Sequence, residues 1–210
     1  MRSLTVTLLA VILTVCGSSL NAQEDDFLDR QTIASITVLP PMGESVPSSA
    51  RQLSADLFMS KLKLRRASCR LVGPEEALTR IERASLMGDY TGFVNLISQT
   101  GVVNRDVLKL IGSAVETDAV LLINLLDYQE EKGSWWYGKG GKNLGRIQYT
   151  LFATSKGEKV WESLEFRQHD SKLSTSPYPM ERVIGDISDK AVTSILTGRQ
   201  NTDVRRKKPK

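Results

Sequence analysis

The stretch "NRDVLKLIGSAVETDAVLLINLLDY", residues 104–128, decides the fold of this 210-residue chain. Asn104 is a good helix cap, and apolar residues follow it at the spacing of one helical face. That stripe consists of Val103, Val107, Leu110, Ile111 and Ala114. The next apolar run is continuous rather than alternating, which is typical of a central strand covered on both faces. A helix that leads directly into such a strand predicts a sheet flanked by helices.

Upstream of this stretch, the sequence predicts two short strands and up to three helices. "TIASITVLPP" (32–41) is a strand with Ala34, Ile36 and Val38 on one face, ended by two prolines. Ser48 or Ser49 can cap the next helix. Its apolar stripe is formed by Ala50, Leu53, Leu57 and Leu64, widened by Phe58 and Leu62. "CRLVG" (69–73) is a short strand, and helices are expected over 74–84 and 88–101.

Downstream, the sequence predicts a hairpin and a last helix. Residues 145–155 alternate, with Ile147, Tyr149 and Leu151 on one face, and the turn at Lys156-Gly157 leads into a second strand over 159–168. Met180, Ile184, Ile187, Ala191 and Ile195 form the clearest helical stripe in the chain. Gly198 is a natural stop for that helix.

The order of these elements predicts one domain over residues 32–198, of the α/β or α+β class. Consecutive hairpin strands beside strand–helix–strand units give a single mixed sheet of about five strands with flanking helices. A long hairpin loop is expected around residues 129–146.

The amino terminus reads as an export signal. Arg2 precedes an apolar run of about twelve residues, Leu4 to Val15, which suits a signal peptide and is too short to span a bilayer. Cleavage after Ala22 gives a signal peptide over 1–22. Lipidation at Cys16 is the less favoured alternative, because Val15 is not small. Residues 23–31 are polar and read as a tether, and Cys69, the one cysteine left after cleavage, reads as a small buried apolar residue.

Positive charge is concentrated at the carboxyl terminus. The net charge is +4, and residues 199–210 form a basic tail. In an exported protein this tail does not indicate nucleic-acid binding; it reads as solvated or as weakly attracted to an anionic surface. The tail residues considered for such a contact are Arg205, Arg206, Lys207, Lys208 and Lys210.

The sequence offers no catalytic residue, no metal site and no cofactor site. His169 is the single histidine, so the usual nitrogen and sulfur ligand sets for zinc cannot form, and we expect it in a polar surface loop. No Gly-x-Ser-x-Gly element is present. In "EEKGSWWYGKGGKNLGR" (130–146), Gly141-Lys142 is followed by Asn143, which does not satisfy a phosphate-binding loop.

Trp135, Trp136 and Tyr137 are the unusual part of that segment. Its charges prevent it from forming a pair of membrane-spanning strands. One interpretation is a lid, in which the three aromatic side chains fold back onto the sheet edge. The other is a contact site for a partner protein, because exposed aromatic residues with a polar rim concentrate binding energy.

Three segments together resemble a bacterial envelope superfamily. They are "ITVLPP" (36–41), "VLKLIGSAVETDAVLLINLLDY" (107–128) and "SKGEKVWESLEF" (155–166), of which "GEKVW" is the most specific. The superfamily contains the curli secretion lipoprotein, the lipoprotein activator of penicillin-binding proteins and the amino-terminal domain of the Tol translocation protein. The chain lacks the length for the secretion protein's inserted barrel hairpins.

The resemblance implies a compact mixed sheet flanked by helices, in the periplasm or at the outer membrane, which acts through protein contacts rather than catalysis. We therefore expect a non-enzymatic protein of envelope assembly, secretion or cell-wall synthesis that binds another envelope protein or itself. Two alternatives remain open. One is a subunit of an oligomeric channel or ring, and the other is an envelope enzyme of unrecognised type.

Overall fold

The chain folds into one open five-stranded sheet with helices on both faces. This is a computed structural model, and it describes residues 26–137, 139–171 and 174–201, without the side chain of Trp135. The expected signal peptide, Cys16 and the last nine residues of the basic tail lie outside the described residues. None of the helices within these ranges is both long and apolar enough to cross a membrane.

The strands run in the order β2-β1-β3-β4-β5, which makes the sheet mixed as predicted. β1 (Ser35–Val38) lies parallel to both β2 (Arg70–Val72) and β3 (Ala119–Glu131). β3, β4 (Lys142–Ala153) and β5 (Glu158–Asp170) form an antiparallel meander. The carboxylate of Asp118 fixes the parallel part, because its Oδ2 accepts hydrogen bonds from the backbone nitrogens of Ala34 and Ser35 at 3.0 and 2.9 Å.

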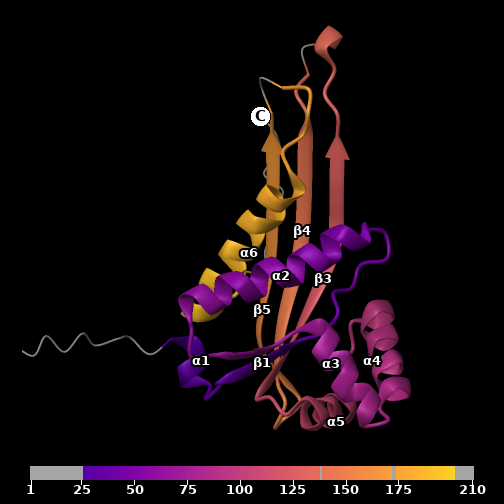
Figure 1. Cartoon of the computed structure of the whole chain (residues 1–210), viewed down its shortest axis with the longest axis vertical. Helices are drawn as coiled ribbons and strands as arrows, with labels where there is room; N and C mark the ends of the chain where they lie inside the picture. The colour runs from indigo at the N-terminus through magenta and orange to yellow at the C-terminus, as the bar shows by residue number, and fades with distance from the viewer. Residues whose placement is uncertain (1–25, 138, 172–173, 202–210) are drawn as a thin grey trace, which may run out of the picture.

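The sheet separates two apolar cores. On one face lie α1 (Phe27–Arg30), α2 (Ser48–Arg65) and α6 (Met180–Thr197); on the other lie α3 (Pro74–Arg83), α4 (Met87–Thr100) and α5 (Arg105–Val115) (Figure 1). β3 contributes to both, since Leu121 and Ile123 face the first core, and Val120 and Leu122 face the second. This confirms the prediction of a central strand covered on both faces.

The hairpin alternation and the stripe of α6 are also confirmed. Ile147, Tyr149 and Leu151 are buried in the first core together with Ile184, Ile187, Ala191 and Ile195. Gly198 ends α6 in the left-handed conformation, with φ of 71°. Cys69 is buried and free, and burial raises the pKa of its thiol, as suits a packing residue.

Two helical faces differ from the expected stripes. α2 begins after Pro47 and has no side-chain cap, and it buries Ala50, Phe58 and Leu62, whereas Leu64 is 83% exposed. α5 is capped by Asn104 as expected, but it buries Leu108, Ile111 and Val115 and leaves Leu110 49% exposed. Both helices have more leucines than one face can hold, so the neighbouring elements decide which leucines are covered.

Part of the segment 23–31 is folded rather than a tether. α1 is a single turn that Asp26 caps, and its Leu28 is fully buried in the first core. Arg66 pairs with both Asp26 and Asp29 and ties this turn to the end of α2. The acidic residues at the start of the domain therefore hold that turn against the body.

Candidate functional site

The most distinctive feature is an arm built from the far ends of β3, β4 and β5. Its strands extend well beyond α3, α4 and α5, and the short 3-10 turn Trp135–Tyr137 lies at its end (Figure 1). α6 lies along the first part of the arm and leaves the end uncovered (Figure 1). We call the residues from 132 to 141 the tip.

The expected long hairpin loop around residues 129–146 is shorter in the structure, because residues 129–131 and 142–146 belong to the paired strands. The ladder of β3 and β4 continues from Tyr128↔Gly145 to Glu131↔Lys142, so only residues 132–141 connect the strands. The charged residues Glu130, Glu131 and Lys142 made this region look like a loop. They are exposed in the structure, and a strand that projects beyond its helices has no need for an apolar side.

A second loop holds the tip in place. The backbone nitrogen of Gly133 donates to the carbonyl oxygen of Thr175 at 2.7 Å, and that of Gly141 donates to Ser174 at 3.0 Å. Ser171 in turn donates to the carbonyl oxygen of Gly141 at 2.8 Å. The connection between β5 and α6 therefore braces the hairpin from the side.

Glycines permit this close approach of backbones. A Cβ atom on Gly133 would lie 2.3 Å from the carbonyl oxygen of Lys139, and one on Gly141 would lie 2.5 Å from the nitrogen of Pro177. Real Cβ atoms do not approach other atoms so closely. The glycines that suggested a phosphate loop thus serve backbone packing at the tip.

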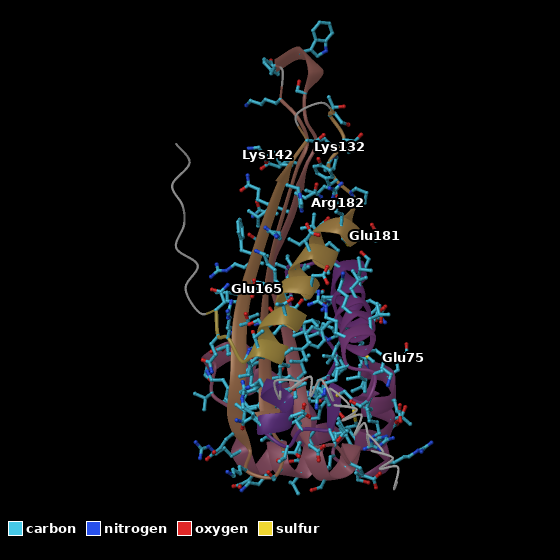
Figure 2. All side chains as sticks on the ribbon, turned by 90° about the vertical axis from the view of Figure 1, so that its left-hand side faces the viewer. Glu75, Lys132, Lys142, Glu165, Glu181 and Arg182 are labelled. Carbon is cyan, nitrogen blue, oxygen red and sulfur yellow. The ribbon has the colours of Figure 1, made fainter. Side chains whose placement is uncertain are left out.

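Trp136 and Tyr137 of the tip are exposed to solvent. Trp136 is 92% exposed and Tyr137 is 80% exposed, which excludes a lid made of these two side chains. The side chain of Trp135 lies outside what the structure describes. Lys132, the first residue of the tip, lies beside Lys142, and Glu181 and Arg182 at the start of α6 lie below them (Figure 2). An aromatic pair of this exposure, with charged residues around it, has the composition of a binding surface.

A polar cluster lies near the end of β5. Nε2 of His169 lies 3.0 Å from Oδ2 of Asp186, and its ring lies 5.2 Å from the ring of Tyr178. The guanidinium of Arg182 lies 4.7 Å from the centre of the Tyr178 ring, a cation–π distance. His169 is therefore part of β5 and not of a polar loop as expected, and it joins β5 to α6 and to the bracing loop.

Buried polar groups continue along the same face. Nδ2 of Asn143 donates to the hydroxyl oxygen of Tyr128 at 3.2 Å, and Asn143 is fully buried. Burial raises the pKa of Tyr128, so it stays neutral and can hold this contact at physiological pH. This contact links β3 and β4 near the far end of their ladder.

Among the described residues no group of three or more His, Cys, Asp or Glu side chains could hold a metal ion. Burial acts to raise the pKa of the Glu162 carboxyl, but hydrogen bonds from Lys159 and Gln148 lower it by more than burial raises it. An ionised carboxylate held by a lysine and an amide is typical of an ion-paired surface.

Comparison with known proteins shows resemblance in structure and none in sequence. No protein-family model matches the chain, and no curated protein matches it. The PelC dodecamer from Paraburkholderia phytofirmans is similar at 12% identity and a TM-score of 0.45, over 78% of this chain and 89% of that one. Lipoprotein GNA1162 from Neisseria meningitidis is similar at 19% identity and 0.44, over 77% and 97%.

The carboxyl-terminal domain of LpoB from Escherichia coli is similar at 13% identity and a TM-score of 0.38, over 64% of this chain and 82% of that chain. At such identities the likeness concerns the fold alone, so the residues of the site are argued from this chain.

Proposed function

We propose that this protein is a non-enzymatic component of the cell envelope, in the periplasm or at the outer membrane, that works by binding another protein through the tip of its arm. Its setting would be envelope assembly, secretion or cell-wall synthesis, as the sequence resemblance implies. The observation that carries the proposal is the exposure of Trp136 and Tyr137 at the end of a braced, projecting hairpin.

Without a binding role, the tip would expose two apolar side chains to water with no gain in stability for the fold. A solvent-exposed indole stabilises nothing in the fold, and a neighbouring phenol adds a second apolar face. In interfaces, tryptophan and tyrosine are the residues that most often carry the binding energy. Backbone hydrogen bonds at Gly133 and at Gly141 hold both ends of the tip. Little conformational freedom is therefore lost when it binds.

In-cell cross-linking tests the contact. A photoreactive residue at Tyr137 should capture one dominant envelope protein, identified by mass spectrometry, and the same residue at Leu64 should not. Leu64 is a matched control because it is an apolar residue, 83% exposed, on α2 in the helical body. Equal capture from both positions, or capture from neither, would contradict the proposal.

Substitution separates binding from folding. Trp135, Trp136 and Tyr137 replaced together by alanine should abolish recovery of the captured protein, while the free energy of unfolding changes by less than about 1 kcal/mol. Leu64→Ala should leave both unchanged. A collapse of the fold in the triple variant would instead support a packing role for the aromatic residues.

The oligomeric alternative predicts a different outcome. A channel or ring subunit should scatter light as an assembly of several chains, in buffer or in detergent. If tip contacts join copies of this chain, the cross-link at Tyr137 should give a species of twice the mass. A monomeric mass in both solvents, together with a heterologous cross-link, would favour an adaptor for another protein.

A further inference from the structure

The outer edge of β5 is a long strand edge at the side of the sheet. β5 is the last strand in the sheet order and spans 13 residues, whereas β2 at the other edge spans three. The backbone nitrogen of Leu164 points outward, because it donates to the carbonyl oxygen of Asn201 at 2.6 Å. Backbone groups alternate in direction along a strand, so those of Phe166 and Gln168 also point outward. Within the described ranges, neither nitrogen donates to another backbone group.

A groove of about 540 Å³ lies beside this edge, between β5 and α6. Glu165 and Arg167 line it from the strand. Two carboxylates line it from the helix, and both already have partners, since Asp186 contacts a histidine and Asp189 contacts a lysine and an arginine. The charges on β5 are therefore the ones left to interact with a ligand.

Glu165 and Arg167 have unmet electrostatic demands in the described part of the chain. Glu165 is only 4% exposed, and its one side-chain hydrogen bond is accepted by Oε1 from the hydroxyl of Ser163 at 2.6 Å. Nε of Arg167 is buried and has no hydrogen-bond partner. A buried charge without a counterion and a buried donor without an acceptor both cost free energy. A ligand that brings a cation to Glu165 and an acceptor to Arg167 would relieve both costs.

The spacing of the two charges identifies the kind of ligand. Glu165 and Arg167 are two positions apart on one face of a strand, so they lie about 7 Å from each other. Alternate side chains of a second strand have the same spacing, and its backbone could pair with Phe166 and Gln168. We propose that this edge binds an extended segment of a partner protein, antiparallel to β5, with a basic side chain opposite Glu165 and an acidic one opposite Arg167.

The register of an antiparallel pair defines the order of side chains in that segment. The partner residue opposite Phe166 exchanges two backbone hydrogen bonds with it, and the two neighbours of that residue point into the groove. Phe166 is 36% exposed on the face away from α6, which favours an apolar side chain opposite it. Read from its amino end, the segment is therefore acidic, apolar and basic.

A second copy of β5 does not fit this position. Glu165-Phe166-Arg167 has the required order, and a pair of strands centred on Phe166 would match the charges. That pairing would place Gln168 of the second copy opposite Leu164, where Asn201 is already bonded. The segment must instead end or turn away after its basic residue, which a separate partner can do.

Peptide binding to the full-length chain tests the proposal. The probe is the peptide Thr-Thr-Thr-Glu-Val-Lys with both ends blocked, and the control, Thr-Thr-Thr-Lys-Val-Glu, exchanges its two charged residues. The probe should bind at least tenfold more tightly, because the control sets like charges opposite each other. It should also slow hydrogen exchange at the amides of Phe166 and Gln168 at least tenfold. Equal affinities, a preference for the control, or no binding would overturn the proposal.

Hydrogen exchange without peptide distinguishes the other possible occupants. The amides of Phe166 and Gln168 should exchange rapidly in the free chain. Slow exchange in dilute solution would mean that the chain covers its own edge, and protection that grows with protein concentration would mean that a second copy covers it. Either result would overturn the proposal.

A charge reversal at Arg167 tests the assigned register. Arg167→Glu should weaken binding of the probe at least tenfold and strengthen binding of Thr-Thr-Thr-Lys-Val-Lys. Lys109→Glu is the matched control, because it changes the net charge equally but lies on α5 and does not line the groove. It should leave both affinities unchanged. Loss of the probe without a gain for the second peptide, in a variant that unfolds at the wild-type temperature, would contradict the register.

The alanine variant of the three aromatic residues at the tip separates this edge from the tip. It should bind the probe as tightly as the wild type, because none of those residues lines the groove. Weaker binding of the probe by that variant would show that the edge is not an independent site.

Discussion

A substitution at Gly141 tests the bracing of the tip most directly. An added Cβ would lie 2.5 Å from the nitrogen of Pro177 and 2.6 Å from the carbonyl carbon of Ser176. Backbone atoms cannot rotate out of the way as a side chain does. We expect Gly141→Ala to lower the free energy of unfolding by about 1–3 kcal/mol, measured by urea denaturation.

Gly92 provides the control for this substitution. It lies inside α4, and nothing lies within 4 Å of the position that its Cβ would occupy. Gly92→Ala should therefore stabilise the protein by about 0.5–1 kcal/mol, because alanine loses less backbone entropy in a helix. A similar loss of stability in both variants would argue against the close approach at the tip.

Tyr90 gives the fold a dependence on alkaline pH. Burial raises its pKa to about 12, whereas the unfolded chain titrates near 10, so the folded state holds the proton more tightly. Its contribution to stability is full below pH 10 and falls as the pH rises towards 12. Tyr90→Phe should unfold at the same urea concentration as the wild type at pH 7 and at a higher one at pH 11.

Part of this pH dependence should survive in the variant. Tyr149 is fully buried, and burial raises its pKa as well. The Tyr90→Phe protein should therefore lose less stability between pH 7 and 11 than the wild type, without becoming independent of pH. Parallel pH profiles of the two proteins would contradict the assignment to Tyr90.

Single positions also mark where the sequence misled. Leu64 and Leu110 belong to helices whose apolar residues outnumber the positions on one face, and spacing alone cannot choose among them. His169 was expected in a loop because it begins the polar segment that follows the predicted strand over 159–168. Its partner Asp186 is nearly two turns into a helix that starts eleven residues later, and no local pattern connects the two.

Among the elements, α6 packs closely against β4 along the first part of the arm. A Cβ on Gly145 would lie 2.8 Å from Cδ1 of Ile187 and 3.2 Å from Cγ1 of Val183, so the helix lies unusually close to the strand there. Gly145→Ala should lower the free energy of unfolding only slightly, because the end of the Ile187 side chain can shift. Gly145→Val should cost about 1–3 kcal/mol of unfolding free energy, measured by thermal denaturation.

The graded pair distinguishes packing from strand propensity. Valine favours strands more than alanine does, so a sheet without a helix above it would become more stable from alanine to valine. A loss that grows with side-chain size supports the contact with α6. A gain from alanine to valine would show that the helix does not limit this position.

The hairpin itself was predictable only where it meets the body. Between 147 and 153 the apolar side chains alternate because one face meets α2 and α6. That alternation predicted the strand. Beyond Gly145 both faces meet water or polar side chains, so the strand carries charges and its sequence resembles a loop. The buried Asn143 shows that position can be enforced there without an apolar pattern.

For the whole molecule, β3 makes the two cores one cooperative unit. Leu122 packs with α3, α4 and α5, whereas its neighbour Ile123 packs with α2 and α6. Leu122→Ala should lower the free energy of unfolding by about 2–5 kcal/mol. Trp161 is buried in the opposite core, and its near-ultraviolet circular dichroism should show the same unfolding midpoint as the far-ultraviolet signal. Separate midpoints would mean that the two cores unfold independently.

The architecture as a whole was accessible from the sequence because helix–strand order and buried periodicity are strong signals. The continuous apolar run of β3 placed the centre of the sheet, and the stripe of α6 placed the cover of one face. The direction of the arm was not accessible, because it depends on strand length beyond the core. The exposure of Trp136 and Tyr137 follows from that length and not from their own neighbours.

The projecting strands set a stand-off distance. Beyond Leu125, β3 continues to Glu131, which at about 3.4 Å per residue places the turn roughly 20 Å from the last buried leucine of that strand. If the proposed partner binds at Trp136, it would be held clear of the helical body by a spacer of that length. The body surfaces would then stay available to a second molecule, and the protein could bridge two neighbours that never touch each other.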